Sequence, residues 1–191
     1  MRLEYPGVEG NGDIYIDVLK AICGNTSDKS MCDLMCYHAP YTSQLGFNER
    51  TYVDVLDRGL DDKEEQKYFV NSDVIRFLEA AEQAWDVTIC SDGIEHLYLS
   101  KGKRLIELME GLSDKQIIFT PTRDKNLVMD SDPDSHKSSW TPDDFEAYAI
   151  IEFPDFHPTL NQGAFFAFKC GKIIDEFERV KNELKNKSWA I

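Results

Sequence analysis

The sequence predicts an α/β protein, a three-layer sandwich in which helices cover both faces of a mostly parallel, seven-stranded sheet. Short apolar runs alternate along the chain with segments of helical periodicity, which is typical of βαβ units around a parallel sheet. The last two apolar runs, residues 149–153 and 164–168, have no helical segment between them, which predicts an antiparallel hairpin ending the sheet. The length of 191 residues suits one domain with a full core.

The first third of the chain predicts a helical extension, residues 1–30, ahead of a core sheet, residues 31–170. In the extension, residues 12–22 carry apolar side chains at the spacing of one helix face. Three strands follow from compact apolar or β-branched runs, and the acidic stretch between the second and third predicts a short helix. The strands are expected at residues 31–37, 51–56 and 68–70, and the short helix at 61–66.

The middle of the chain predicts two helices, each followed by a strand. Asp73 can accept hydrogen bonds from the exposed amides of a first helical turn and is the expected N-cap of one helix. Ser100 is the candidate cap of the other. Residues 87–90 form a continuous apolar run, as expected for a strand buried on both faces, and residues 116–119 form the next strand.

The last third of the chain begins with a long polar segment, residues 122–139, which predicts a lid or binding loop because passive connectors are usually shorter. Thr141 and Asp144 then have the spacing of a capping box with Pro142 between them, so a helix is predicted to restart there. Residues 171–191 form the final predicted helix, with one apolar face on the core.

The composition restricts the kind of partner. The formal net charge of −14 repels phosphate backbones, because nucleic-acid affinity depends largely on Lys and Arg. We therefore expect a small-molecule substrate and no nucleic acid. No apolar run approaches the roughly 18 residues of a membrane span, residues 1–6 lack the apolar core of a signal peptide, and five cysteines without a framework spacing favour a reducing compartment. A cytoplasmic protein without a membrane partner is expected, and the pattern predicts no particular oligomeric state.

Three stretches resemble class I methyltransferases that use S-adenosylmethionine. Residues 86–97 read DVTICSDGIEHL and resemble the family's fourth-strand motif, a strand opening with Asp that runs into an acidic turn and then Glu-His-Leu. Residues 69–73 read FVNSD and resemble the third-strand motif, whose terminal acid lies near the adenine. Residues 136–145 read HKSSWTPDDF and resemble the stretch before the fifth helix. The resemblance covers residues 31–170 and implies a Rossmann-like methyltransferase fold. It also implies cofactor contacts from Asp73, Val74, Asp92 and Gly93.

The first motif departs from the family pattern of an acid followed by Gly-x-Gly-x-Gly. With Asp33 as the acid, Met35, Tyr37 and Ala39 occupy the three glycine positions. Glycine is favoured there because it adopts positive φ angles freely and lets the backbone pass close to the cofactor. All four residues are expected to line the cofactor site, where the side chains occupy space that the methionine moiety normally uses. S-adenosylmethionine is therefore expected to bind weakly or in a displaced pose. The helix after this loop is also expected to be shortened.

The second motif offers two candidates for the acid that accepts the ribose hydroxyls, Asp54 and Asp57. An aspartate in the middle of a buried strand is costly unless it is hydrogen-bonded. This favours Asp57, at the end of the strand predicted over residues 51–56, with Asp54 as the second choice. Either residue can instead be a cap or a surface acid.

The residues after the fourth predicted strand are candidates for chemistry, because ligands of α/β sheets bind outside the carboxyl ends of the strands. His96 titrates near neutral pH and is the best candidate for a base that removes the acceptor's proton, with Asp92 as a second catalytic residue. Glu95 and His96 can alternatively brace the loop. Three further histidines lie in or beside loops that can join the site: His38, His136 and His157.

A metal site is the alternative use of these residues. Asp92, Glu95, His96 and one distant histidine resemble the spacing of metal-assisted RNA ribose methyltransferases, which have Glu where Asp92 stands. Because the acidic charge argues against an RNA substrate, the sequence prediction is that no metal is bound. The expected function is methyl transfer from S-adenosylmethionine to a small-molecule or sugar-type acceptor. The alternative is a catalytically inactive binding or regulatory module of the same fold.

Overall fold

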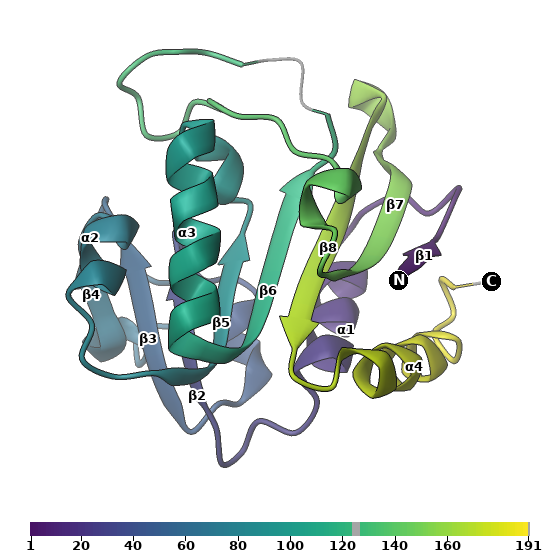
Figure 1. The fold of residues 1–191 in the computed structure, drawn as a ribbon, viewed down its shortest axis with the longest axis horizontal. Coiled ribbons are helices and arrows are strands. Elements are labelled where there is room, and N and C mark those ends of the chain that lie inside the picture. The colour runs from purple at the N-terminus through teal and green to yellow at the C-terminus, as the bar shows by residue number, and fades with distance from the viewer. Residues whose placement is uncertain (124–126, 191) are drawn as a thin grey trace.

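The computed structural model describes residues 1–123 and 127–190, and it is a three-layer α/β sandwich, as predicted. Helices α2 (Val74–Glu79) and α3 (Leu99–Leu112) cover one face of a central sheet, and α1 (Gly12–Cys23) and α4 (Ile173–Leu184) cover the other (Figure 1). A hydrophobic core fills the space between the sheet and each helical layer. None of the described helices has both the length and the apolar character needed to cross a bilayer.

The sheet has eight strands in the order β1-β7-β8-β6-β5-β2-β3-β4. Strand β8 is antiparallel to both of its neighbours, and every other pairing is parallel, so the predicted C-terminal hairpin is confirmed as β7 and β8. The eighth strand is β1, which pairs with β7 and which the sequence analysis missed because it has only three residues. The strands are β1 (Arg2–Glu4), β2 (Ser30–Leu34), β3 (Glu49–Asp54), β4 (Phe69–Asn71), β5 (Trp85–Ser91), β6 (Ser113–Pro121), β7 (Ala149–His157) and β8 (Gln162–Cys170).

The strand order fixes where a ligand can bind. The chain builds β2, β3 and β4 outward on one side and then crosses back to add β5 and β6 on the other side of β2. The topological switch point therefore lies between β2 and β5. In open parallel sheets the ligand crevice forms at that point, outside the carboxyl ends of the strands.

The connections from β2 to β3 and from β3 to β4 contain no α-helix. The first holds only the 3₁₀ turn η1 (Thr42–Leu45), which confirms the predicted shortening, and the second holds η2 (Gln66–Tyr68). The short helix predicted at residues 61–66 is wrong: that acidic segment forms turns, because it has no apolar stripe to bury. On the face of the sheet that α1 and α4 cover, these two helices pack against each other. The predicted apolar face of α4 is confirmed by its buried side chains, Phe177, Val180 and Leu184.

The helices on the opposite face begin mostly as predicted. The Asp73 side chain accepts a hydrogen bond from the Arg76 amide, which confirms it as the N-cap of α2. Ser100 is not a cap, since α3 already begins at Leu99. Glycine is required inside α3 at Gly102, because a Cβ there would lie 2.5 Å from the Trp140 ring.

The capping box of Thr141 and Asp144 is confirmed, although it opens a single 3₁₀ turn, η4 (Pro142–Phe145), and not an α-helix. The predicted long loop, residues 122–139, lies between β6 and this turn. In Figure 1 it passes over the end of α3, on the side of the sheet to which the arrowhead of β6 points. It has no helix or strand in the part that the structure describes.

Candidate functional site

Two adjacent cavities lie at the carboxyl ends of β2, β3 and β5. The first has a volume of about 420 Å³ and the second about 590 Å³, within the range of small-molecule sites. The walls that they share are formed by Met35, Asp54, Val55, His96 and Pro133. The first cavity is also lined by Tyr15, Asp33, Ala39, Arg58, Ser91 and Asp92. The second is also lined by Asp73, Val74, Leu97, Tyr98, Lys101 and Met129.

The loop after β2 keeps the backbone conformation of a glycine-rich loop although it has no glycine. The φ angles are 59° at Met35, 51° at Tyr37 and 51° at Ala39, all in the left-handed region. These are the three positions that the sequence aligns with the family's glycines. Left-handed φ costs a residue with a Cβ roughly 1–2 kcal/mol, so the surrounding structure stabilises this loop. The backbone of this loop is therefore left-handed at all three positions, and the residues there carry side chains where glycine has none.

Met35 is one of the residues that line both cavities. Its side chain packs over Gly93 on the β5 side: a Cβ on Gly93 would lie 2.9 Å from Met35 Cβ and 3.0 Å from Cys90 Sγ. Gly93 itself is buried beneath this contact. Tyr37 is different, since 52% of its surface is exposed. The methionine side chain is thus part of the wall that the two cavities share.

Asp33 lies at the floor of the first cavity and is only 2% exposed. The Thr42 hydroxyl donates a hydrogen bond to Asp33 Oδ2. Burial raises the pKa of Asp33 to about 7, against the Thr42 hydrogen bond and with a smaller contribution from the nearby Asp54. The second oxygen, Oδ1, is buried without a hydrogen-bond partner among the described residues. Asp33 is therefore placed to accept a hydrogen bond from a ligand.

Other buried polar atoms without a hydrogen bond also face this cavity. Among the described residues, Tyr15 OH, Arg58 Nε and Ser91 Oγ are in this state, and all three residues line the first cavity. Burial raises the pKa of Tyr15 and the neighbouring Ser91 hydroxyl lowers it as a hydrogen-bond partner, so these two hydroxyls lie at the limit of hydrogen-bonding geometry. Native structures contain few such groups, and a missing ligand or water is the usual reason for them. Their concentration in one cavity marks it as a binding site.

The choice between the two acids of the second motif is decided by the end of β3. Asp54 is the last residue of that strand and lines both cavities, whereas Asp57 lies in the following loop and lines neither. The strand predicted over residues 51–56 was thus placed two residues too late. Asp54 Oδ2 accepts from the Tyr37 amide at 3.0 Å, and Oδ1 accepts from the Leu56 amide at 2.9 Å. These bonds satisfy the burial cost that argued against Asp54 and leave each oxygen able to accept one more hydrogen bond.

Asp92 follows β5 and projects into the first cavity. Its φ angle of 47° is again left-handed, and its amide donates to the Phe119 carbonyl of β6 at 3.0 Å. The residue is exposed to solvent through the cavity, and the protein atoms packed around it still displace part of the water near its carboxylate. This desolvation raises the pKa of Asp92 to about 7, and the positive potential of His136 acts in the opposite direction.

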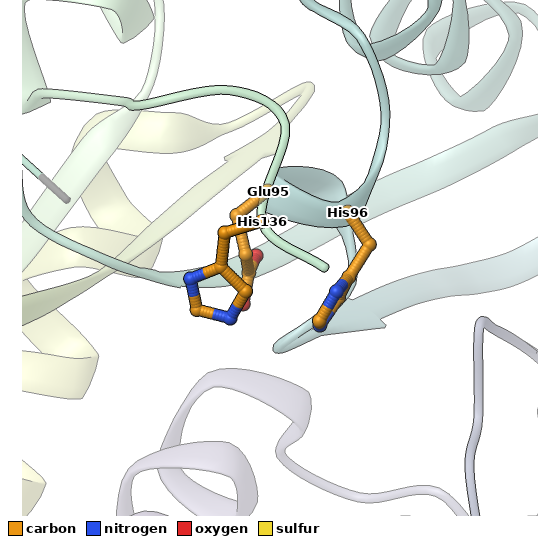
Figure 2. Close-up of side chains that lie close together, drawn as sticks. All are labelled: Glu95, His96 and His136. Carbon is orange, nitrogen blue, oxygen red and sulfur yellow. The ribbon is translucent and has the colours of Figure 1, made fainter. Parts of the chain in front are cut away.

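Glu95, His96 and His136 lie close together, as Figure 2 shows, and His136 is near enough to Asp92 to act on it electrostatically. Each offers one ligand atom within 4.8 Å of the other two, and the two imidazole rings meet edge to face with centroids 4.7 Å apart. Desolvation, followed by repulsion from His136, lowers the pKa of His96. A buried carboxylate with two imidazoles is a typical donor set for a divalent transition metal. Among the three loop histidines proposed from sequence, His136 joins the site.

Contacts with the long loop hold this cluster together. The amides of Lys137 and Ser138 donate to the Glu95 carbonyl at 2.7 and 3.0 Å, which places His136 beside the turn after β5. Glu95 is 1% exposed, and its Oε2 accepts from the Thr120 hydroxyl at 3.0 Å. Residues about 40 positions apart are thus joined by backbone hydrogen bonds. The part of the long loop that the structure describes is a wall of the site.

The remaining predicted residues divide between the site and the surface. Asp73 and Val74 line the second cavity, as the third-strand motif implied. His38 lies outside both cavities, where its Nδ1 is 2.7 Å from the Gly59 carbonyl, and His157 lies at the end of β7 beside Phe156. The sequence analysis missed Tyr15, Ser91 and Arg58, because no motif marks them. The unusual polar residue Tyr15 in the apolar stripe of α1 was the only available signal.

The structure resembles solved methyltransferases. It superposes on the N-methyltransferase NodS from Bradyrhizobium japonicum WM9 with a TM-score of 0.60 and 11% identity, covering 82% of this chain and 93% of that one. For the small RNA methyltransferase HEN1 the TM-score is 0.59 with 15% identity, covering 84% of this chain but only 25% of that one. For a SAM-dependent methyltransferase from Archaeoglobus fulgidus it is 0.57 with 17% identity, covering 84% and 95%.

The chain has the class I methyltransferase fold. The sequence itself matches no protein-family model and no curated protein. At identities between 11% and 17% these similarities define the architecture only. The resemblance stated from the strand motifs is therefore confirmed at the level of the fold, and the activity has to be argued from the cavities.

Proposed function

We propose that the protein is an S-adenosylmethionine-dependent methyltransferase that acts on a small-molecule or sugar-type acceptor. The observation that carries the proposal is the pair of adjacent cavities at the switch point, with Asp33 Oδ1 buried at the floor of the first one and without a hydrogen-bond partner among the described residues. NodS has been solved in complex with S-adenosylhomocysteine, and a chain of similar fold, ChlM from Synechocystis, with bound SAM. The cofactor is therefore a natural candidate for the occupant.

The residues present suit this cofactor. Asp54 keeps a free lone pair on each oxygen for the two ribose hydroxyls, and Asp73 and Val74 line the second cavity, where we place the adenine. Asp33 can accept a hydrogen bond from the amino group of the methionine moiety. When bound, S-adenosylmethionine supplies a methyl group on a sulfonium, ready for in-line displacement. Met35 and Tyr37 carry side chains where the family has glycine, so we expect S-adenosylmethionine to bind more weakly than it does to a glycine loop.

The acceptor is expected to meet Asp92 and His96. Both line the first cavity, and both lie within reach of a hydroxyl or amine that needs to lose its proton. The lowered pKa of His96, caused by desolvation, keeps its imidazole neutral near pH 7 and available as a base. Asp92 can orient the acceptor or accept a hydrogen bond from it. These two side chains are thus our proposed catalytic residues.

A second candidate is metal-assisted methylation of a sugar hydroxyl, which the convergence of Glu95, His96 and His136 favours. The fit is supported by the chemistry of the donor set: one buried carboxylate and two imidazoles on a preformed loop contact. A divalent ion held there supplies a Lewis acid that makes a hydroxyl easier to deprotonate. In that case His96 is a ligand and cannot be the base, so Asp92 takes that role.

Methyl transfer tests the proposal. The purified protein is incubated with labelled S-adenosylmethionine and the small-molecule fraction of the native extract, with free sugars and nucleosides as defined acceptors. We expect release of S-adenosylhomocysteine that depends on the acceptor and falls strongly in Asp92→Asn. Loss of activity with a chelator and its return with Mn²⁺ selects the metal-assisted candidate. Cofactor binding without transfer to any acceptor supports the inactive module, for which the substituted glycine positions are the motivating observation.

A further inference from the structure

Arg58 is the positive charge of the first cavity. Among the described residues that line it, Arg58 is the only lysine or arginine, whereas Asp33, Asp54, Asp92 and Asp134 are acidic. The chain as a whole carries a net charge of −14, so an anionic ligand group is repelled from most of the surface. An anion can be accepted in this cavity only where a cation faces it.

The contacts of Arg58 hold the guanidinium in place but leave hydrogen-bonding capacity unused. Its Cζ atom lies over the Tyr37 ring at 5.0 Å from the ring centroid, and Nη2 donates a hydrogen bond to Asp134 Oδ1 at 2.6 Å. Its Nε is buried and has no hydrogen-bond partner among the described residues. The Asp134 side chain is 59% exposed on the long loop, so water can replace Arg58 as its partner. The arginine is therefore oriented, incompletely satisfied and paired with a displaceable carboxylate.

We propose that Arg58 is an anion-binding residue of the ligand site. In the free protein Asp134 is the ion-pair partner of Arg58, and an anionic group of the ligand replaces Asp134 on binding. The chemical class is a carboxylate or a phosphate, because a guanidinium binds either group with parallel hydrogen bonds. Tyr37 contributes here what a glycine cannot, an aromatic face that positions the guanidinium. The side chain at this glycine position thus acquires a role in recognition.

Two sources can supply the anion, and the inference rests on the proposed function for only one of them. One source is the carboxylate of the cofactor's methionine moiety. The other is a phosphate or carboxylate of the acceptor. One experiment distinguishes these two sources with three probes. S-adenosylhomocysteine carries the methionine carboxylate, 5′-methylthioadenosine has the nucleoside without that carboxylate, and inorganic phosphate represents an anion of the acceptor.

The test is binding of these three probes by calorimetry to the wild-type protein, Arg58→Gln and Asp134→Asn. Arg104→Gln is the matched control, since Arg104 is an exposed arginine on α3 that also pairs with carboxylates and lines neither cavity. We expect Arg58→Gln to weaken one anionic probe by about tenfold or more, as removal of a charged hydrogen bond typically does. Asp134→Asn should strengthen the same probe, and Arg104→Gln should leave all three unchanged.

The outcomes separate the hypotheses. Weaker S-adenosylhomocysteine binding with unchanged 5′-methylthioadenosine binding assigns Arg58 to the cofactor carboxylate, and weaker phosphate binding alone assigns it to the acceptor. If phosphate binds through Arg58 but no nucleoside probe binds, the proposed function fails and the anion site stands. Equal affinities of wild type and Arg58→Gln for both anionic probes overturn the inference, as does a wild-type protein that binds neither. Should Arg58→Gln not fold, an unchanged anion affinity in Asp134→Asn overturns it instead.

Discussion

Replacing Asp33 by asparagine should make the free protein more stable at alkaline pH. Asp33 is 2% exposed, receives one hydrogen bond from Thr42 and leaves Oδ1 without a partner. Burial therefore raises its pKa from 3.8 to about 7. Asparagine has nearly the same shape, keeps an oxygen for Thr42 and carries no charge, so it removes the cost of ionising this buried group.

The sign and the size of this stability difference follow from proton linkage. A carboxyl group with a raised pKa in the folded state stabilises the fold while it is protonated, and it loses that contribution as the pH rises toward the folded pKa of about 7. Each pH unit between the two pKa values is worth about 1.4 kcal/mol. From pH 5 to pH 8 the group crosses about two such units. The free energy of unfolding of Asp33→Asn, minus that of wild type, should thus rise by about 3 kcal/mol.

Urea unfolding at pH 5 and pH 8 measures this difference, with Asp57→Asn as the control. Asp57 is an exposed acid in the loop after β3, so its replacement reports the effect of removing one charge from the whole protein. A pH-independent difference between Asp33→Asn and wild type would falsify the idea that Asp33 is an unsatisfied acid at the cavity floor. A variant that loses stability relative to wild type as the pH rises would contradict the sign.

The other predictions concern the backbone, the packing and the metal-binding cluster. At position 37, where φ is 51°, Tyr37→Gly should unfold with a free energy about 1 kcal/mol higher than Tyr37→Ala, although alanine is favoured at ordinary φ; equal stabilities would show that the loop is not left-handed. Gly102→Ala should lower the unfolding free energy by about 1–3 kcal/mol because its Cβ lies 2.5 Å from Trp140, whereas a stabilised variant would contradict that packing. Co²⁺ should bind to the cluster of Glu95, His96 and His136 and give a visible absorption band, and His136→Asn should weaken the affinity for Co²⁺ about tenfold or more. An unchanged Co²⁺ titration would rule out His136 as a ligand.

The sequence was informative where local patterns carry the information. The capping role of Asp73 and the box of Thr141 and Asp144 depend on neighbouring residues, and both are confirmed. The alignment of Met35 with a glycine position stays a prediction, and the positive φ angle of Met35 is compatible with it. The end of β3 was predicted two residues too late, because strand ends are the least certain part of such predictions, and this shift places Asp54 in the cavities where Asp57 was expected.

Features that depend on distant contacts were beyond the sequence. His136 reaches Glu95 only because the Lys137 and Ser138 amides bond to the Glu95 carbonyl, an interaction between segments about 40 residues apart. The role of Arg58 depends on Tyr37 and Asp134, which come from two other loops. Neither arrangement leaves a local motif. The strand β1 was missed for a related reason. Its three residues are too few to give a sequence pattern, and it is recognised only by its pairing with β7.

The most direct test of the account is calorimetric titration of the wild-type protein with S-adenosylhomocysteine, repeated with Asp54→Asn. The cavities, the Asp33 Oδ1 atom without a partner among the described residues and the strand-end position of Asp54 predict binding of one ligand per chain, weak because of Met35, and weaker still in the variant. Absence of any binding heat at millimolar ligand would contradict cofactor use. Binding that is unchanged in Asp54→Asn would show that the ligand occupies another place than the one proposed.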